Sequence, residues 1–193
     1  MAEIKSTFER VMEKVEALGR ASRDEIEAEE QLKNGMRLGA EYLQGEGGAL
    51  AGGLTAETGS GSQFRQGLVQ TLLRNVMLPR GEETQTMEKA MAGLMELGGG
   101  AGDIGAVLGD LQHIITRYIE HRAQLRQQLE KGIRQQMEQL VEQQTGQPGR
   151  AMNIDPAMHP RFREEWQRIS GELNSQYGQV VEQHKTLLAQ RLG

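Results

Sequence analysis

The sequence predicts an all-α fold, an elongated helical bundle built on a long antiparallel coiled-coil hairpin, with N-terminal helices and a Gly-rich linker. Apolar residues recur at spacings of three and four along most of the 193 residues, and glycine or proline separates these periodic segments. The chain contains only three Phe, three Tyr and one Trp. So few aromatic side chains cannot fill a thick core, which favours thin helix-on-helix packing through aliphatic residues.

Residues 1–44 are predicted to form the N-terminal helices. An apolar stripe at spacings of four and three indicates the first helix. Gly19 and Ser22 indicate a break, because Ser22 followed by Glu25 resembles a capping box that starts a second helix, which runs to about residue 44. The stripe consists of Ile4, Phe8, Val11, Val15 and Leu18.

Residues 45–61 are predicted to be a flexible linker. This stretch holds seven glycines and has no periodic apolar face. The entropy lost in ordering it would therefore exceed what it could gain by burial.

Residues 62–97 are predicted to form two short amphipathic helices. The first has no acidic residue, so on a flexible tether it fits a groove of a partner protein or an anionic membrane surface. Its region carries three arginines, which would contribute only about 3 kcal/mol at such a membrane. The alternative is that both helices pack inside the protein, where methionines commonly fill cores. The candidate partner-docking residues are Phe64, Leu68, Leu72 and Val76 in the first helix and Met87, Met91 and Met95 in the second.

Residues 103–192 are predicted to form the long helical hairpin. Asp103 is a suitable N-cap for the first arm, and Pro156 or Pro160 lies near the first turn of the second arm. Both arms carry heptad-like stripes that step by four at some points. The stripes are Leu108, Leu111, Ile115, Tyr118, Arg122, Leu125, Leu129, Ile133, Met137 and Leu140, and Phe162, Trp166, Ile169, Leu173, Tyr177, Val180, His184 and Leu188.

When the two arms are laid antiparallel, their stripes match layer by layer. Leu140 is predicted to lie opposite Trp166 at one end of the matched region. Arg122 and His184 then share a layer and form a candidate polar register layer, because buried polar groups fix the alignment of coiled-coil helices.

The sequence nominates no catalytic, cofactor-binding or metal-ligating residue, and the protein is not expected to be an enzyme. Residues 100–105 have the spacing G-x-G-x-x-G, but a dinucleotide site needs a preceding strand, and a helix is predicted there. The four histidines lack the close spacing of a helical metal site. With no Cys, the chain has neither disulfides nor thiolate ligands.

Charge and hydropathy limit the classes of partner. The formal charge of −5 includes no strongly basic block, so nucleic acid is not expected as the main ligand. No apolar leader and no stretch of about 20 apolar residues is present, so we expect a cytoplasmic protein.

These observations predict a non-enzymatic helical interaction protein, an adaptor, scaffold or chaperone-like module that binds another protein through helical surfaces. The alternatives are a peripheral membrane-surface protein that uses the helix 62–78 and a metal-binding helical bundle. Either the N-terminal helices complete a bundle around the hairpin or the chain forms a homodimer, and the homodimer is preferred.

Overall fold

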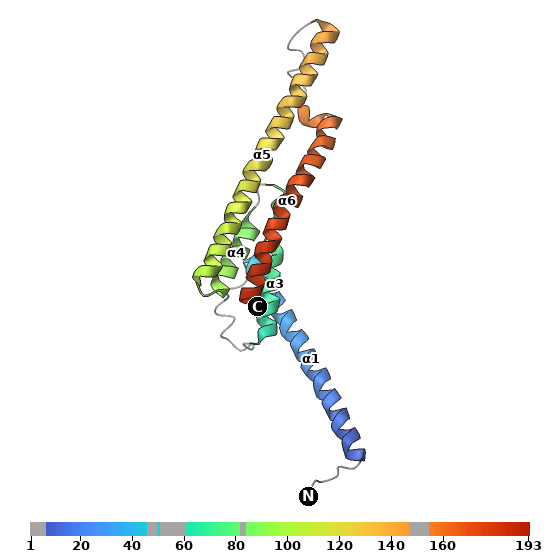
Figure 1. The fold of residues 1–193 in the computed structure, drawn as a ribbon, viewed down its shortest axis with the longest axis vertical. Coiled ribbons are helices and arrows are strands. Elements are labelled where there is room, and N and C mark those ends of the chain that lie inside the picture. The colour runs from blue at the N-terminus through green and yellow to red at the C-terminus, as the bar shows by residue number, and fades with distance from the viewer. Residues whose placement is uncertain (1–6, 46–49, 51–60, 82–83, 147–154) are drawn as a thin grey trace. The chain divides into compact units, whose positions relative to one another are not determined.

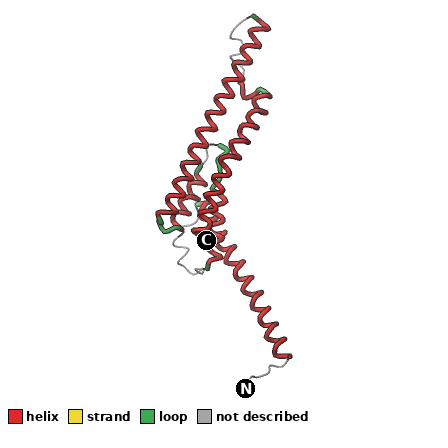
Figure 2. Tube along the Cα trace, in the orientation of Figure 1, coloured by secondary structure: helices red, strands yellow, loops and turns green. Residues whose placement is uncertain are grey.

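The computed structural model describes residues 7–45, 50, 61–81, 84–146 and 155–193. Within these residues the regular elements are helices and no strand occurs, which confirms the predicted all-α class (Figures 1 and 2). In chain order the elements are α1 (Thr7–Gln44), α3 (Ser62–Asn75), α4 (Gln85–Leu97), α5 (Gly102–Thr145), the short 3-10 helix η2 (Pro156–Met158) and α6 (Pro160–Leu192).

The chain divides into two compact units. Unit 1 comprises Met1–Val76, Gln85–Ile104 and Leu188–Gly193, and unit 2 comprises Met77–Thr84 and Gly105–Leu187. This division differs from the predicted segments, because residues 77–84 group with unit 2 and both ends of the predicted hairpin group with unit 1.

Helix α1 is continuous where the sequence predicted a break. Its 38 residues run through Gly19 and Ser22 without interruption and end at Gln44, where Gly45 adopts a positive φ of 82°. Each interior glycine costs a helix only about 1 kcal/mol, and the 35 other positions of α1 outweigh its three glycines, Gly19, Gly35 and Gly39. A serine that could cap a helix can also lie inside one.

Helices α1 and α3 touch through their backbones in unit 1. A Cβ added to Gly35 of α1 would clash with the carbonyl oxygen of Phe64 and lie 3.0 Å from the amide nitrogen of Leu68. A Cβ added to Gly67 of α3 would clash in the same way with the carbonyl oxygen of Leu32. Glycine at both positions therefore permits the close crossing of the two helices.

Residues of several segments form the core of unit 1. One of them is Leu50, which is fully buried and would lie 3.0 Å from a Cβ added to Gly93. One residue of the predicted flexible linker 45–61, Leu50, therefore belongs to this core. Apart from Gly45, Leu50 and Gly61, that predicted linker lies outside the described residues.

The side chain of Arg65 in α3 caps the C-terminal ends of two other helices in unit 1. Its Nε donates a hydrogen bond to the carbonyl oxygen of Leu192 at 2.6 Å, and its Nη2 donates to the carbonyl oxygen of Leu97 at 2.9 Å. The last carbonyl groups of a helix lack partners within the helix. The guanidinium thus satisfies acceptors at the C-terminal ends of α4 and α6.

Glycines also form the turn between α4 and α5. Gly99 and Gly100 have positive φ values of 61° and 73°, and the amide of Gly100 donates to the carbonyl oxygen of Met95. This is a glycine helix stop, as predicted. The element before the G-x-G-x-x-G spacing is helix α4, so the strand that a dinucleotide site needs is not there.

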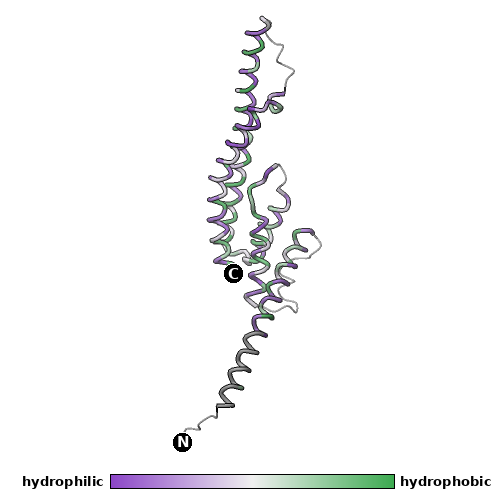
Figure 3. The backbone as a smooth tube through the Cα atoms, turned by 90° about the vertical axis from the view of Figure 1, so that its right-hand side faces the viewer, coloured by the Kyte–Doolittle hydropathy of each residue, from purple (hydrophilic) through white to green (hydrophobic). Residues whose placement is uncertain are grey.

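In unit 2, the described contacts join α5 to α6 in opposite numerical order. The Tyr118 hydroxyl donates a hydrogen bond to Asn174 Oδ1 at 2.7 Å, and Arg161 Nη1 donates to Gln136 Oε1 at 3.1 Å. Apolar residues recur along both helices with hydrophilic residues between them (Figure 3). Leu173 and Ile133 are among the buried ones, as their stripes predict.

The predicted layers of the hairpin do not match these contacts. Trp166 was expected opposite Leu140, but Leu140 is 56% exposed, and Arg122 lies over the ring of Trp166. Arg122 is several helical turns nearer the start of α5. On α6, Val181 is buried where the stripe predicted Val180, which is 37% exposed. The predicted register is therefore wrong, although eight of the eighteen stripe positions are buried.

Candidate functional site

The candidate partner-docking residues lie in the core of unit 1. Their burial favours the alternative that both helices pack inside the protein. Only Met95 is exposed, at 37%. Phe64, Leu68, Leu72, Val76, Met87 and Met91 are all buried.

The two residues of the candidate polar register layer contact other groups. The guanidinium carbon of Arg122 lies 5.4 Å from the centroid of the Trp166 ring, a cation–π contact. His184 Nδ1 lies 2.8 Å from the carbonyl oxygen of Val180 on its own helix. The described contacts of Arg122 and His184 do not bring the two residues together, so the polar layer stays a prediction.

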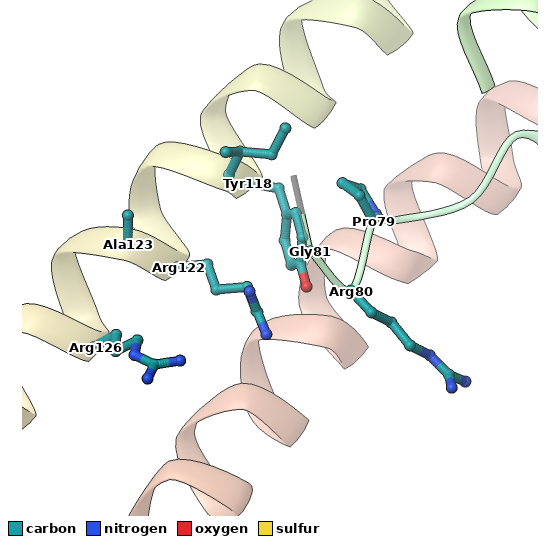
Figure 4. A pocket seen from close by; sticks show the side chains of 8 residues that line it. Pro79, Arg80, Gly81, Tyr118, Arg122, Ala123 and Arg126 are labelled. Atoms are coloured by element: carbon teal, nitrogen blue, oxygen red, sulfur yellow. The ribbon is translucent and has the colours of Figure 1, made fainter. Parts of the chain in front are cut away.

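Arg122 instead belongs to a pocket within unit 2, which we call the arginine pocket. Its volume is about 430 Å³, within the range of small-molecule sites. Figure 4 shows Arg122 and Arg126 extending from α5 on the same side, with the ring of Tyr118 between Arg122 and the segment 79–81. The full lining is Pro79, Arg80, Gly81, Tyr118, Ile119, Arg122, Ala123 and Arg126.

Aromatic rings of α6 position the two guanidiniums of α5. The guanidinium carbon of Arg126 lies 6.0 Å from the ring centroid of Trp166 and 5.9 Å from that of Phe162. These two rings are stacked, with centroids 6.5 Å apart and an interplanar angle of 15°. Arg126 Nε also donates to Glu130 Oε1 at 2.9 Å. Both cations therefore lie over aromatic rings, and Arg126 is also held by its ion pair with Glu130.

The ring of Tyr118 lines the arginine pocket between Arg122 and the segment 79–81. Its ring meets Tyr177 edge to face, with centroids 5.5 Å apart. Burial raises the pKa of Tyr118 above its ordinary value, and the positive charge of Arg122 offsets part of that rise. The hydroxyl therefore stays protonated at neutral pH and keeps its hydrogen bond to Asn174.

A second depression of unit 2 is a shallow groove of about 470 Å³ along α6, which we call the Met77 groove. Met77 is 58% exposed, a large exposure for an apolar side chain. A Cβ added to Gly178 would meet no atom within 4 Å, so the groove floor is open there. The lining is Met77, Leu78, Asn174, Ser175, Gly178, Gln179, Val181 and Glu182.

Residues 55–190 match a family of unknown function, DUF6657. The chain belongs to this family. No curated protein and no solved structure matches the chain. The DUF6657 match covers α3 to α6 almost completely, so it includes every residue that lines the arginine pocket and the Met77 groove.

Two classes of site are not found in the described part of this DUF6657 chain. No three or more His, Asp or Glu side chains gather there in an arrangement that would hold a metal ion. No described helix combines the length and the hydropathy that crossing a membrane requires.

The sequence did not identify Arg126 as a site residue, and it did not identify Trp166 as the ring that two arginines contact. It assigned Trp166 to the apolar stripe of the second arm and Arg122 to the polar layer. The available signal was the spacing of four between Tyr118, Arg122 and Arg126, which places all three on one face of α5. The sequence alone does not predict which aromatic ring contacts that face, because this depends on the register between α5 and α6.

Proposed function

We propose that this protein is a non-enzymatic helical interaction protein that binds a partner protein through unit 2. In this proposal α5 and α6 are the arms of an antiparallel hairpin that acts as an adaptor or chaperone-like surface. The contacts of Tyr118 with Asn174 and of Gln136 with Arg161 support the antiparallel arrangement, because numbers rise along one helix as they fall along the other.

The single observation that carries the proposal is the exposure of Met77 beside an open groove. Large apolar side chains that stay in water next to a concave surface are typical of protein interaction sites. Methionine suits such a site because its flexible thioether adapts to different partners. The buried residues of α3 and α4 do not serve this purpose, so we place the interaction surface in unit 2, at Met77 and the neighbouring face of α6.

The test is affinity capture from native cell extract with the full chain and two matched glycine variants. Gly178→Gln places a long side chain in the Met77 groove, where the structure leaves space for it. Gly171→Gln makes the same change on the same helix outside the groove, at another position with open space.

We expect a partner that is captured by the wild-type chain and by Gly171→Gln but not by Gly178→Gln. Circular dichroism should show that all three chains fold equally well. A partner that Gly178→Gln retains in full would contradict the proposal. So would capture no stronger than that of an unrelated helical protein on the same support.

A further inference from the structure

We propose that the arginine pocket binds a small organic molecule that carries a phosphate or carboxylate group on an apolar body. This inference goes beyond the proposed function and does not depend on a protein partner. It rests on the way in which Arg122 and Arg126 are held, and on the apolar wall beside them.

The two arginines are a like-charged pair on one turn of α5. Residues four apart on a helix are neighbours, and like charges at that spacing repel each other. Both guanidiniums also converge on the ring of Trp166, at 5.4 Å and 6.0 Å. Among the described residues, the ion pair at this place joins Glu130 to Arg126, and the contacts of Arg122 include no carboxylate. A bound oxyanion would supply the missing negative charge.

A cation–π contact does not use the N–H groups of a guanidinium, which match the geometry of a carboxylate or phosphate. Arg126 donates its Nε–H to Glu130, so an oxyanion would meet the terminal N–H groups of that side chain. The cation–π contacts also restrict the arginine rotamers before a ligand arrives, which lowers the entropy cost of binding. Arg122 and Arg126 are therefore the residues to which we assign the oxyanion.

The rest of the pocket wall is apolar. Pro79, Ile119 and Ala123 line it together with the ring of Tyr118. An apolar or aromatic body attached to the oxyanion would bury surface against these residues, so an inorganic anion would use only part of the site. Figure 4 shows the side chain of Arg80 directed away from Arg122 and Arg126, and we assign it no contact with the oxyanion.

The first experiment measures binding of defined probes to the full chain at constant ionic strength. Trp166 is the only tryptophan, so its fluorescence reports directly on the two guanidiniums that lie over its ring. Isothermal titration calorimetry gives an independent affinity. The probes are phenyl phosphate, benzoate, inorganic phosphate and the neutral phenol.

We expect saturable binding of phenyl phosphate or benzoate, at least about tenfold weaker binding of inorganic phosphate, and none of phenol. The stronger of the first two probes identifies the ligand as a phosphate or as a carboxylate. Saturation by neither aromatic anion would overturn the proposal. Equal affinity for phenyl phosphate and inorganic phosphate would overturn the role of the apolar wall.

The second experiment uses variants of equal charge change. Arg122→Gln and Arg126→Gln should each weaken binding by about tenfold or more, since each variant loses a charge-assisted hydrogen bond to the oxyanion. Arg134→Gln removes an exposed arginine of the same helix outside the pocket and should change the affinity less than about twofold. Equal weakening by Arg134→Gln would show that only net charge matters, and the site would be rejected.

Discussion

Replacing Gly67 by Ala tests whether α1 and α3 really cross at backbone contact. The new methyl group would lie against the carbonyl oxygen of Leu32, 3.0 Å from its carbonyl carbon and 3.1 Å from the amide nitrogen of Met36. All three atoms belong to the backbone of α1, so no side chain can rotate out of the way. The helix itself has to move, and with it the contacts that surround the crossing.

Two opposing terms set the size of the effect. Overpacking of a tight interface costs about 1–3 kcal/mol, and a clash with a helix backbone belongs at the upper end of that range. Alanine in place of glycine favours the helix by about 1 kcal/mol. We therefore expect Gly67→Ala to lower the free energy of unfolding by about 2 kcal/mol.

The matched control is Gly171→Ala in α6, where an added Cβ meets no atom within 4 Å. Here only the helix term acts, so the control should stabilise the protein by about 0.5–1 kcal/mol. Urea unfolding followed by circular dichroism gives both values, and hydrogen exchange of the α3 amides localises the loss. If Gly67→Ala were as stable as the wild type, or changed stability in the same direction as Gly171→Ala, the close crossing would be refuted.

Three further predictions concern hydrogen bonds. Arg65→Lys keeps the charge but cannot reach both the Leu97 and Leu192 carbonyl groups, so we expect a loss of about 1–3 kcal/mol in urea unfolding. Tyr118→Phe removes the bond to Asn174 and should cost about 0.5–1.5 kcal/mol in the same assay. Because burial raises the pKa of Tyr118, its contribution to stability is complete below about pH 10, its unfolded value, and is lost as the pH rises through the higher folded value. The urea midpoint of unfolding should therefore fall as the pH is raised from about 8 to about 11, and it should fall less in Tyr118→Phe than in the wild type.

The positions of the helices were largely predictable because their signals are local. The glycines at 98–100, the proline at 160 and the spacing of apolar residues located the ends of α4, α5 and α6 within a few residues. The predicted break in α1 was wrong because Ser22 and Glu25 have the same spacing in a capping box and in a continuous helix. Local patterns cannot separate these two cases.

The sequence did not predict what each apolar face packs against, because an apolar stripe does not show which helix or partner covers it. The stripe of α3 looks the same whether it packs on a partner or on α1. What distinguishes the two cases is a match of small residues, Gly35 and Gly39 in α1 and Gly67 in α3, which lets the backbones meet.

The register between α5 and α6 shows why a repeated stripe is weak information. In a heptad-like pattern, sliding one helix by a whole repeat pairs a new set of apolar residues almost as well as the old one. Apolar layers therefore leave several alignments of nearly equal energy. Residues with directional contacts separate them: Tyr118 can donate to Asn174, and Arg122 can stack on Trp166, in one alignment only. The residues that specify the register are thus also the ones that shape the arginine pocket, and a change of register would dismantle that pocket.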